Sequence, residues 1–170
     1  MASEEYGTFP EGTELTSAED LSGVLIKKNF TLSVAESCTG GMLGSAITSV
    51  PGSGRYFLGG VVTYSNESKE EIIKVPEQIM VKNGAVSEES ATHMAAGVRS
   101  LFGSDVSISI TGIAGPDGGT DAKPVGLVWI GISTKDRAFA KKFNFKGNRE
   151  DVRKSAVNAS MKLLIEELDG

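Results

Sequence analysis

Apolar side chains recur along the chain with two periods that alternate from one segment to the next. A return every three or four positions, typical of a helix with one buried face, marks 17–28, 40–50, 87–103 and a segment opening at 148. Strict alternation, or a short continuous apolar run, marks strands at 31–35, 60–65, 106–110, 125–133 and 139–145. A further helix is predicted to begin near Asn66. The pattern therefore predicts alternating helices and strands.

Helix ends are marked by capping signals. Capping boxes are predicted at 17–20 and 148–151, where a Ser or Asn is followed three positions later by Asp. Ser87 is the predicted N-cap of the clearest helix, which Gly103 ends. One apolar stripe of that helix is expected to face the core, and it comprises Ala91, Met94, Ala95, Val98 and Phe102.

The order of these elements predicts an α/β domain with helices on both faces of a mostly parallel sheet, which a hairpin makes mixed. Residues 1–14 are interpreted as a polar extension and 15–170 as a single domain. Ligands of such folds bind beyond the carboxyl ends of the strands. Polar loops at 36–41, 66–69 and 112–119 each follow a predicted strand. If those strands are parallel neighbours, the three loops meet at one edge of the sheet.

Composition narrows the function. With 17 basic and 22 acidic residues the formal charge is −5, which argues against nucleic acid as a partner. Cys38 is the only cysteine, and the first residues are acidic rather than basic and apolar, so we expect a cytoplasmic protein. The longest apolar run, 125–132, is far shorter than the roughly 20 residues that cross a bilayer, so we expect no membrane association.

Ser37 is the first candidate for chemistry. It lies between a predicted strand and a predicted helix, where unpaired amides at the helix N-terminus would favour an anion or a developing oxyanion. The structural alternative is that Ser37 and Thr39 only cap the helix. Cys38 would need a histidine nearby, but His93, the only one, is predicted to face solvent, so Cys38 is interpreted as a packed hydrophobe. Without a histidine, a serine hydrolase needs lysine as its base.

Lys69 is the candidate base, in the first turn of the helix that begins near Asn66. A helix N-terminus disfavours a protonated ammonium and so favours the neutral amine that a base requires. An ordinary surface lysine beside Glu70 and Glu71 is the alternative. Tyr64 could relay or donate a proton to the Ser37 and Lys69 pair, although an aromatic residue at a strand end also serves packing.

The glycine-rich stretch 112–119 is neither a P-loop nor a dinucleotide fingerprint. Its glycines would let backbone amides approach a phosphate or sugar, and a mobile surface loop is the alternative. Asp117 and Asp121 lack the further ligands of a metal site, so no metal and no cofactor are expected. Arg149, just before the last helix, could hold a phosphate or carboxylate, and a solvated arginine is the alternative.

Together these stretches resemble the CinA C-terminal domain family, whose characterised members are nicotinamide mononucleotide deamidases. The resemblance covers about 17–168, and its motifs are 35–41, 63–69, 84–88, 110–119 and 123–126. It implies a three-layer α/β/α domain with a mixed sheet. Many relatives carry this domain behind a nucleotide-processing domain, for which we expect no room here.

The resemblance also implies a reaction in pyridine nucleotide salvage. Ser37 would attack the carboxamide of nicotinamide mononucleotide and Lys69 would take its proton, with Tyr64 assisting; ammonia would leave and water would release nicotinate mononucleotide. The expected substrate-binding residues are Thr39, Gly40, Gly41, Gly112, Gly115, Gly118 and Arg149.

The alternative is a nucleotide-binding module of the same fold without catalysis, in which Glu36, Thr39 and 112–119 would matter and Ser37 would not. The sequence leaves the oligomeric state open, with a homodimer as one option.

Overall fold

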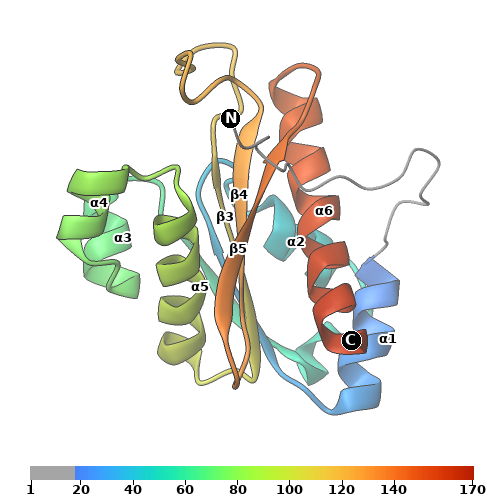
Figure 1. Ribbon diagram of the computed structural model, residues 1–170. Helices are drawn as coiled ribbons and strands as arrows, with labels where there is room; N and C mark the ends of the chain where they lie inside the picture. Colours follow the sequence, from blue (N-terminus) through green and yellow to red (C-terminus); the bar gives the residue numbers. More distant parts are fainter. Residues whose placement is uncertain (1–17) are drawn as a thin grey trace.

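The computed structural model describes residues 18–170 and shows three layers, with a central sheet between two layers of helices (Figure 1). The sheet has the order β2-β1-β3-β4-β5. Its strands are β1 (Leu32–Glu36), β2 (Phe57–Val62), β3 (Val106–Gly112), β4 (Leu127–Ser133) and β5 (Ala138–Asn144). The helices are α1 (Ala18–Lys28), α2 (Met42–Thr48), α3 (Asn66–Ile73), α4 (Glu77–Asn83), α5 (Glu88–Phe102) and α6 (Arg149–Asp169). In Figure 1, α3, α4 and α5 lie on one side of the sheet and α1, α2 and α6 on the other.

The sheet is mixed, as predicted. β1 pairs parallel with both β2 and β3, whereas β3 with β4 and β4 with β5 are antiparallel. Four strands therefore run in one direction and only β4 runs against them. Because β2, β1 and β3 are parallel neighbours, the loops that follow them meet at one edge, which confirms that expectation. The β3–β4 loop stands at the top of Figure 1, at that edge.

The predicted caps within the described chain are present. Ser87 accepts a hydrogen bond from the amide of Ser90 and begins α5, and Gly103 ends it with φ of +64°. Asn148 and Asp151 form the reciprocal capping box of α6. The serines that alternate with isoleucines in β3 donate to backbone carbonyls of α5, since Ser107 and Ser109 reach their acceptors at 2.6 Å. These contacts hold α5 close against the sheet.

Several element boundaries differ from the sequence prediction. β2 covers 57–62 rather than the predicted 60–65, so Gly59 lies in the strand together with Gly60. A Cβ on Gly59 would lie 2.5 Å from the ring of Phe102, and one on Gly60 would lie 2.6 Å from Val34, so these glycines permit close packing. Helix α2 covers only 42–48 of the predicted 40–50. Helix α4 was not predicted, although Pro76 precedes it and Gly84 ends it.

The capping box at 17–20 and the extension at 1–14 involve residues outside those that the structure describes. Within residues 18–170, no helix combines the length and apolar character needed to cross a membrane.

Candidate active site

Ser37 directly follows β1, and its amide donates to the carbonyl of Ile110 on β3 at 3.0 Å. This bond extends the sheet pairing by one residue and fixes Ser37 at the carboxyl edge. Its side chain is 8% exposed, so the hydroxyl lies in a nearly dry environment.

Glu36, the last residue of β1, is buried and caps α2. Its carboxylate accepts hydrogen bonds from the amides of Gly41, Leu43 and Gly44, at 3.1, 3.0 and 2.9 Å. The expectation that these helix N-terminal amides are free for an anion is therefore wrong, because an internal carboxylate already uses them. Within the described chain, neither the Cys38 amide nor the Thr39 amide donates a backbone hydrogen bond to another residue, and the Cys38 amide interacts with its own thiol.

Lys69 lies in the first turns of α3, which begins after the N-cap Ser65. Its side chain is 1% exposed. The amine nitrogen lies 3.1 Å from Ser37 Oγ, 2.7 Å from the carbonyl oxygen of Thr63 and 3.1 Å from that of Tyr64. The structure thus brings the two predicted reacting groups into hydrogen-bond contact, although 32 residues separate them.

The contacts of Lys69 suit both protonation states, and in the structure the amine donates to all three oxygens, as a charged ammonium does. Burial lowers the pKa of Lys69 to about 8, because charging the amine in a desolvated position is unfavourable. A neutral amine has two N–H groups and one lone pair. When the carbonyls of Thr63 and Tyr64 take the two N–H groups, the lone pair faces Ser37 Oγ and can accept its proton.

Cys38 is unsuited to nucleophilic attack. Burial raises the pKa of its thiol to about 11, so the thiolate is scarce at neutral pH. His93 is exposed on α5, as predicted, and its helix packs on the face opposite α6. No other histidine occurs in the sequence.

Tyr64 contacts two residues of the site, Lys69 and Arg149, through two different atoms. Its carbonyl binds the amine of Lys69, whereas its phenol oxygen accepts from Arg149 at 3.3 Å. Arg149 also donates to the carbonyl of Gly115 at 2.7 Å. Arg149 therefore links the loops after β2 and β3. The hydrogen bonds of the described residues place the phenol of Tyr64 on Arg149 rather than on Ser37 or Lys69.

Arg153 is a residue that sequence reasoning missed. It lies one turn after Arg149 on α6, so both side chains leave the same face of the helix. Its guanidinium donates to the carbonyls of Cys38 and Thr39 at 3.1 and 3.0 Å. The signal in the sequence is the spacing of four between two arginines at the start of α6.

The residues expected to bind substrate differ in their placement. Thr39 is fully buried, and its hydroxyl has no hydrogen-bond partner among the described residues; the same holds for the Thr63 hydroxyl. Gly40 is exposed beside Arg153, and Gly41 gives its amide to Glu36. The side chain of Thr39 is thus enclosed by protein, whereas Gly40 borders solvent.

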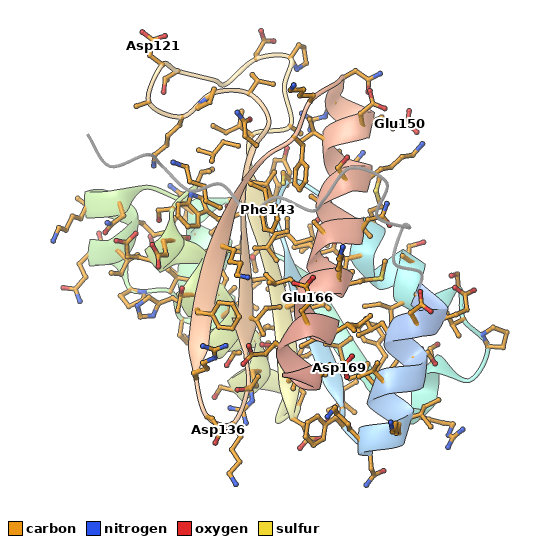
Figure 2. All side chains as sticks on the ribbon, turned by 45° about the vertical axis from the view of Figure 1, so that its right-hand side comes forward. Asp121, Asp136, Phe143, Glu150, Glu166 and Asp169 are labelled. Carbon is orange, nitrogen blue, oxygen red and sulfur yellow. The ribbon has the colours of Figure 1, made fainter. Side chains whose placement is uncertain are left out.

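In the β3–β4 loop, Gly115 lies next to Arg149 and is buried. Gly112 belongs to β3, where a Cβ would lie 2.7 Å from the carbonyl of Leu127, so its role there is packing against β4. Gly118 is exposed. Figure 2 shows Asp121 at the outer tip of the loop, pointing away from the sheet. Within the described residues, no three His, Cys, Asp or Glu side chains gather as a metal site would require.

Fold and site together define a three-layer α/β protein with a buried serine and lysine pair at the carboxyl edge of its parallel strands. The chain belongs to the CinA C-terminal domain family, whose model matches residues 14–168. Among curated proteins, it is 50% identical over 141 residues to a putative competence-damage inducible protein of Desulforudis audaxviator, covering 83% of this chain and 34% of the relative. It is 51% identical over 145 residues to a CinA-like protein of Endomicrobium trichonymphae, covering 85% of this chain and 34% of the relative. The chain thus spans about a third of the length of these relatives.

Solved structures agree with this assignment. A CinA superfamily protein from Klebsiella pneumoniae superposes with a TM-score of 0.86 at 34% identity, over 91% of this chain and 99% of that one. A competence/damage inducible protein from Agrobacterium tumefaciens gives 0.84 at 30% identity, over 96% and 99%. The three-layer mixed fold is therefore that of the CinA superfamily.

Proposed function

We propose that this chain hydrolyses the carboxamide of nicotinamide mononucleotide to nicotinate mononucleotide and ammonia, with Ser37 as nucleophile and Lys69 as base. The single observation that carries the proposal is the 3.1 Å contact between Lys69 Nζ and Ser37 Oγ, made by a buried amine whose pKa is lowered to about 8. The choice of substrate comes from the family resemblance.

The reaction begins when Lys69 takes the hydroxyl proton and Ser37 Oγ bonds to the carboxamide carbon. The carbonyl oxygen becomes an oxyanion, for which the amides of Cys38 and Thr39 are the available donors, since neither donates a backbone hydrogen bond to another residue among those described. The carbon–nitrogen bond then breaks, and Lys69 returns its proton to the leaving nitrogen, which departs as ammonia. Water, deprotonated by Lys69, cleaves the resulting ester. Ser37 recovers its proton and the acid is released.

A binding module without catalysis would have no use for this lysine. Burying an amine away from any carboxylate costs stability, and the described residues provide Lys69 with two carbonyls but no ion pair. Such a cost is characteristic of a functional site. This observation favours an enzyme over the binding module.

The test is ammonia release from nicotinamide mononucleotide by the purified chain, with nicotinate mononucleotide identified by chromatography. We expect turnover by the wild type and none by Ser37→Ala, whose unfolding transition should stay close to that of the wild type because the hydroxyl does not hold the core. Full activity in Ser37→Ala would refute the mechanism. Binding of the mononucleotide by the wild type without ammonia release would support the binding module.

A further inference from the structure

Arg153 fixes the peptide that joins Cys38 to Thr39, next to Ser37. No other group among the described residues binds this peptide. The Nε of Arg153 donates to the carbonyl of Cys38, and Nη2 donates to the carbonyl of Thr39. The Thr39 carbonyl has a second donor in the amide of Met42, and the following amide, of Gly40, bonds to the carbonyl of Ser37. Within the described residues, Arg153 is the only hydrogen-bond donor to the Cys38 carbonyl.

The other end of that peptide carries the free amide of Thr39. In the described chain the only cis peptide is Gly115–Pro116, so the bond between Cys38 and Thr39 is trans. A planar trans peptide directs its C=O and N–H to opposite sides. With its carbonyl bound to α6, the peptide must therefore direct the Thr39 N–H away from α6. A charged donor on the carbonyl also polarises the amide and strengthens the N–H as a donor.

We infer that Arg153 is a positioning residue, which aims and polarises the Thr39 amide so that it stabilises the oxyanion formed when Ser37 attacks a carbonyl. The inference rests on the proposed nucleophilic role of Ser37, but not on the identity of the substrate. Arginine suits the role because its fork binds two consecutive carbonyls at once, which the single ammonium of lysine does less well.

The experiment uses two acyl donors. p-Nitrophenyl acetate transfers its acetyl group to a serine hydroxyl and releases p-nitrophenol, so the rate of Ser37 acylation is measured without any nucleotide, with Ser37→Ala as the blank. We expect Arg153→Ala and Arg153→Gln to be acylated on the order of 10- to 100-fold more slowly than the wild type. With nicotinamide mononucleotide, kcat should fall by a similar factor while KM changes little, because the lost interaction forms only in the transition state.

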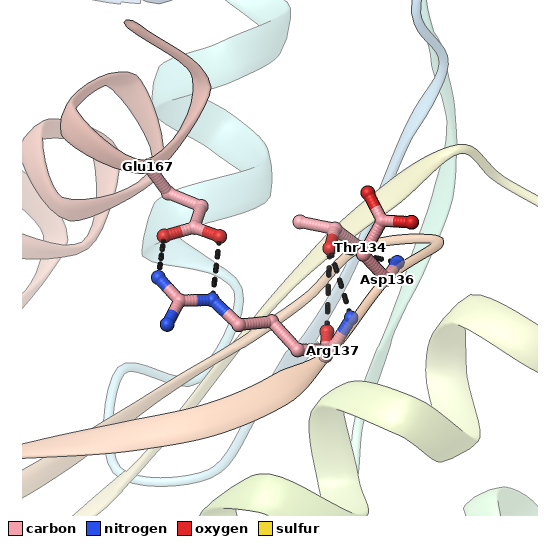
Figure 3. Close-up of polar contacts among 4 residues, drawn as sticks. All are labelled: Thr134, Asp136, Arg137 and Glu167. Carbon is pink, nitrogen blue, oxygen red and sulfur yellow. Dashed lines mark hydrogen bonds and ion pairs between the residues drawn. The ribbon is translucent and has the colours of Figure 1, made fainter. Parts of the chain in front are cut away.

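Two further readouts separate positioning from a general structural role. The pKa that governs the pH dependence of the rate should stay at the wild-type value, because Lys69 is untouched. Added guanidinium should restore part of the rate of Arg153→Ala. Arg137→Ala is the matched control: it removes an arginine that forks onto a single partner, Glu167, at the far end of α6 (Figure 3), and it should be acylated at the wild-type rate. If Arg153→Ala does not fold, Arg153→Gln and Arg153→Lys carry the test.

The outcomes separate this inference from the proposed function. Slower acylation of the Arg153 variants by the ester supports the inference even if the mononucleotide is not turned over. Wild-type rates in all Arg153 variants overturn it while leaving the amidase intact. A wild-type chain that neither the ester nor the mononucleotide acylates at Ser37 overturns both.

Discussion

The amine of Lys69 lies 2.7 Å from the carbonyl oxygen of Thr63, the residue that follows β2. Strand and base thus belong to one short β–α connection, and the turn between them supplies the acceptors that orient the amine. The position of the base is therefore set by local structure and does not depend on a bound ligand. Burial lowers the pKa of this amine to about 8, so both the reaction rate and the stability should change with pH near that value.

The rate of amide hydrolysis should rise with pH. The neutral amine is the active form, and its share increases as pH passes through the lowered pKa of about 8. At pH 7.5 about a quarter of the molecules hold a neutral Lys69, against about 0.1% for an ordinary lysine. We expect kcat/KM for ammonia release to climb from about pH 6 and level off above about pH 9. A profile that is flat or falls over this range would contradict the role of Lys69.

The same pKa makes stability depend on pH. Unfolding returns Lys69 to its ordinary pKa of 10.5, so between about pH 8 and 10.5 the unfolded chain binds a proton that the folded chain does not. Stability should therefore rise with pH across that window, by on the order of 3 kcal/mol for the fully buried amine. Below pH 8 the whole cost of the buried charge is present.

Urea denaturation of the wild type and Lys69→Met at a series of pH values measures this contribution of Lys69 to the free energy of unfolding. The difference in unfolding free energy between the two should shift in favour of the wild type as pH rises from 8 to 10.5, since methionine does not titrate. Other titrating groups cancel in the comparison. A difference that stays constant with pH would show that Lys69 is not desolvated.

Glu36 should matter for stability and, through Ser37, for rate. Glu36→Gln removes a charged acceptor that three backbone amides share. The NH₂ group of the glutamine is itself a donor, so it cannot accept hydrogen bonds from these amides. We expect a loss of about 1–3 kcal/mol in unfolding free energy and a lower kcat. Glu71→Gln, which changes an exposed carboxylate on α3, is the control; it should change the unfolding free energy by no more than a few tenths of a kcal/mol and leave kcat unaltered. Unchanged stability in Glu36→Gln would mean that the cap contributes nothing.

The thiol of Cys38 should be inert. With a pKa of about 11 and 6% exposure, it should resist iodoacetamide at neutral pH in the folded protein and react once the chain is unfolded. Cys38→Ser should keep most of the activity, because the thiol only packs. Mass spectrometry of the native and urea-treated protein checks the first point, and the ammonia assay checks the second. A collapse in rate at constant stability would make Cys38 the nucleophile.

The sequence predicts the parts of the site that depend on local pattern. The strand before Ser37 and the capped helix that carries Lys69 both follow from hydrophobic period and capping residues, and their meeting follows from parallel neighbouring strands. The fork of Arg153 joins residues 114 and 115 positions apart, so no local pattern indicates it. The cap by Glu36 reaches only five to eight positions ahead, but the sequence does not distinguish it from other roles. A buried glutamate beside a candidate nucleophile is equally typical of a catalytic acid, and only the three amides around it identify it as a cap. Helix α4 is too short for a clear period.

The most direct test of the account is the kcat of Lys69→Arg with nicotinamide mononucleotide. Arginine keeps a positive charge beside Ser37 but cannot release its proton near neutrality, so it separates a base from a purely electrostatic group. We predict a loss on the order of 100-fold or more in kcat, equal to that of Lys69→Ala, in a variant whose folding is verified by circular dichroism. A Lys69→Arg enzyme that releases ammonia at close to the wild-type rate would contradict the pairing of Ser37 with Lys69.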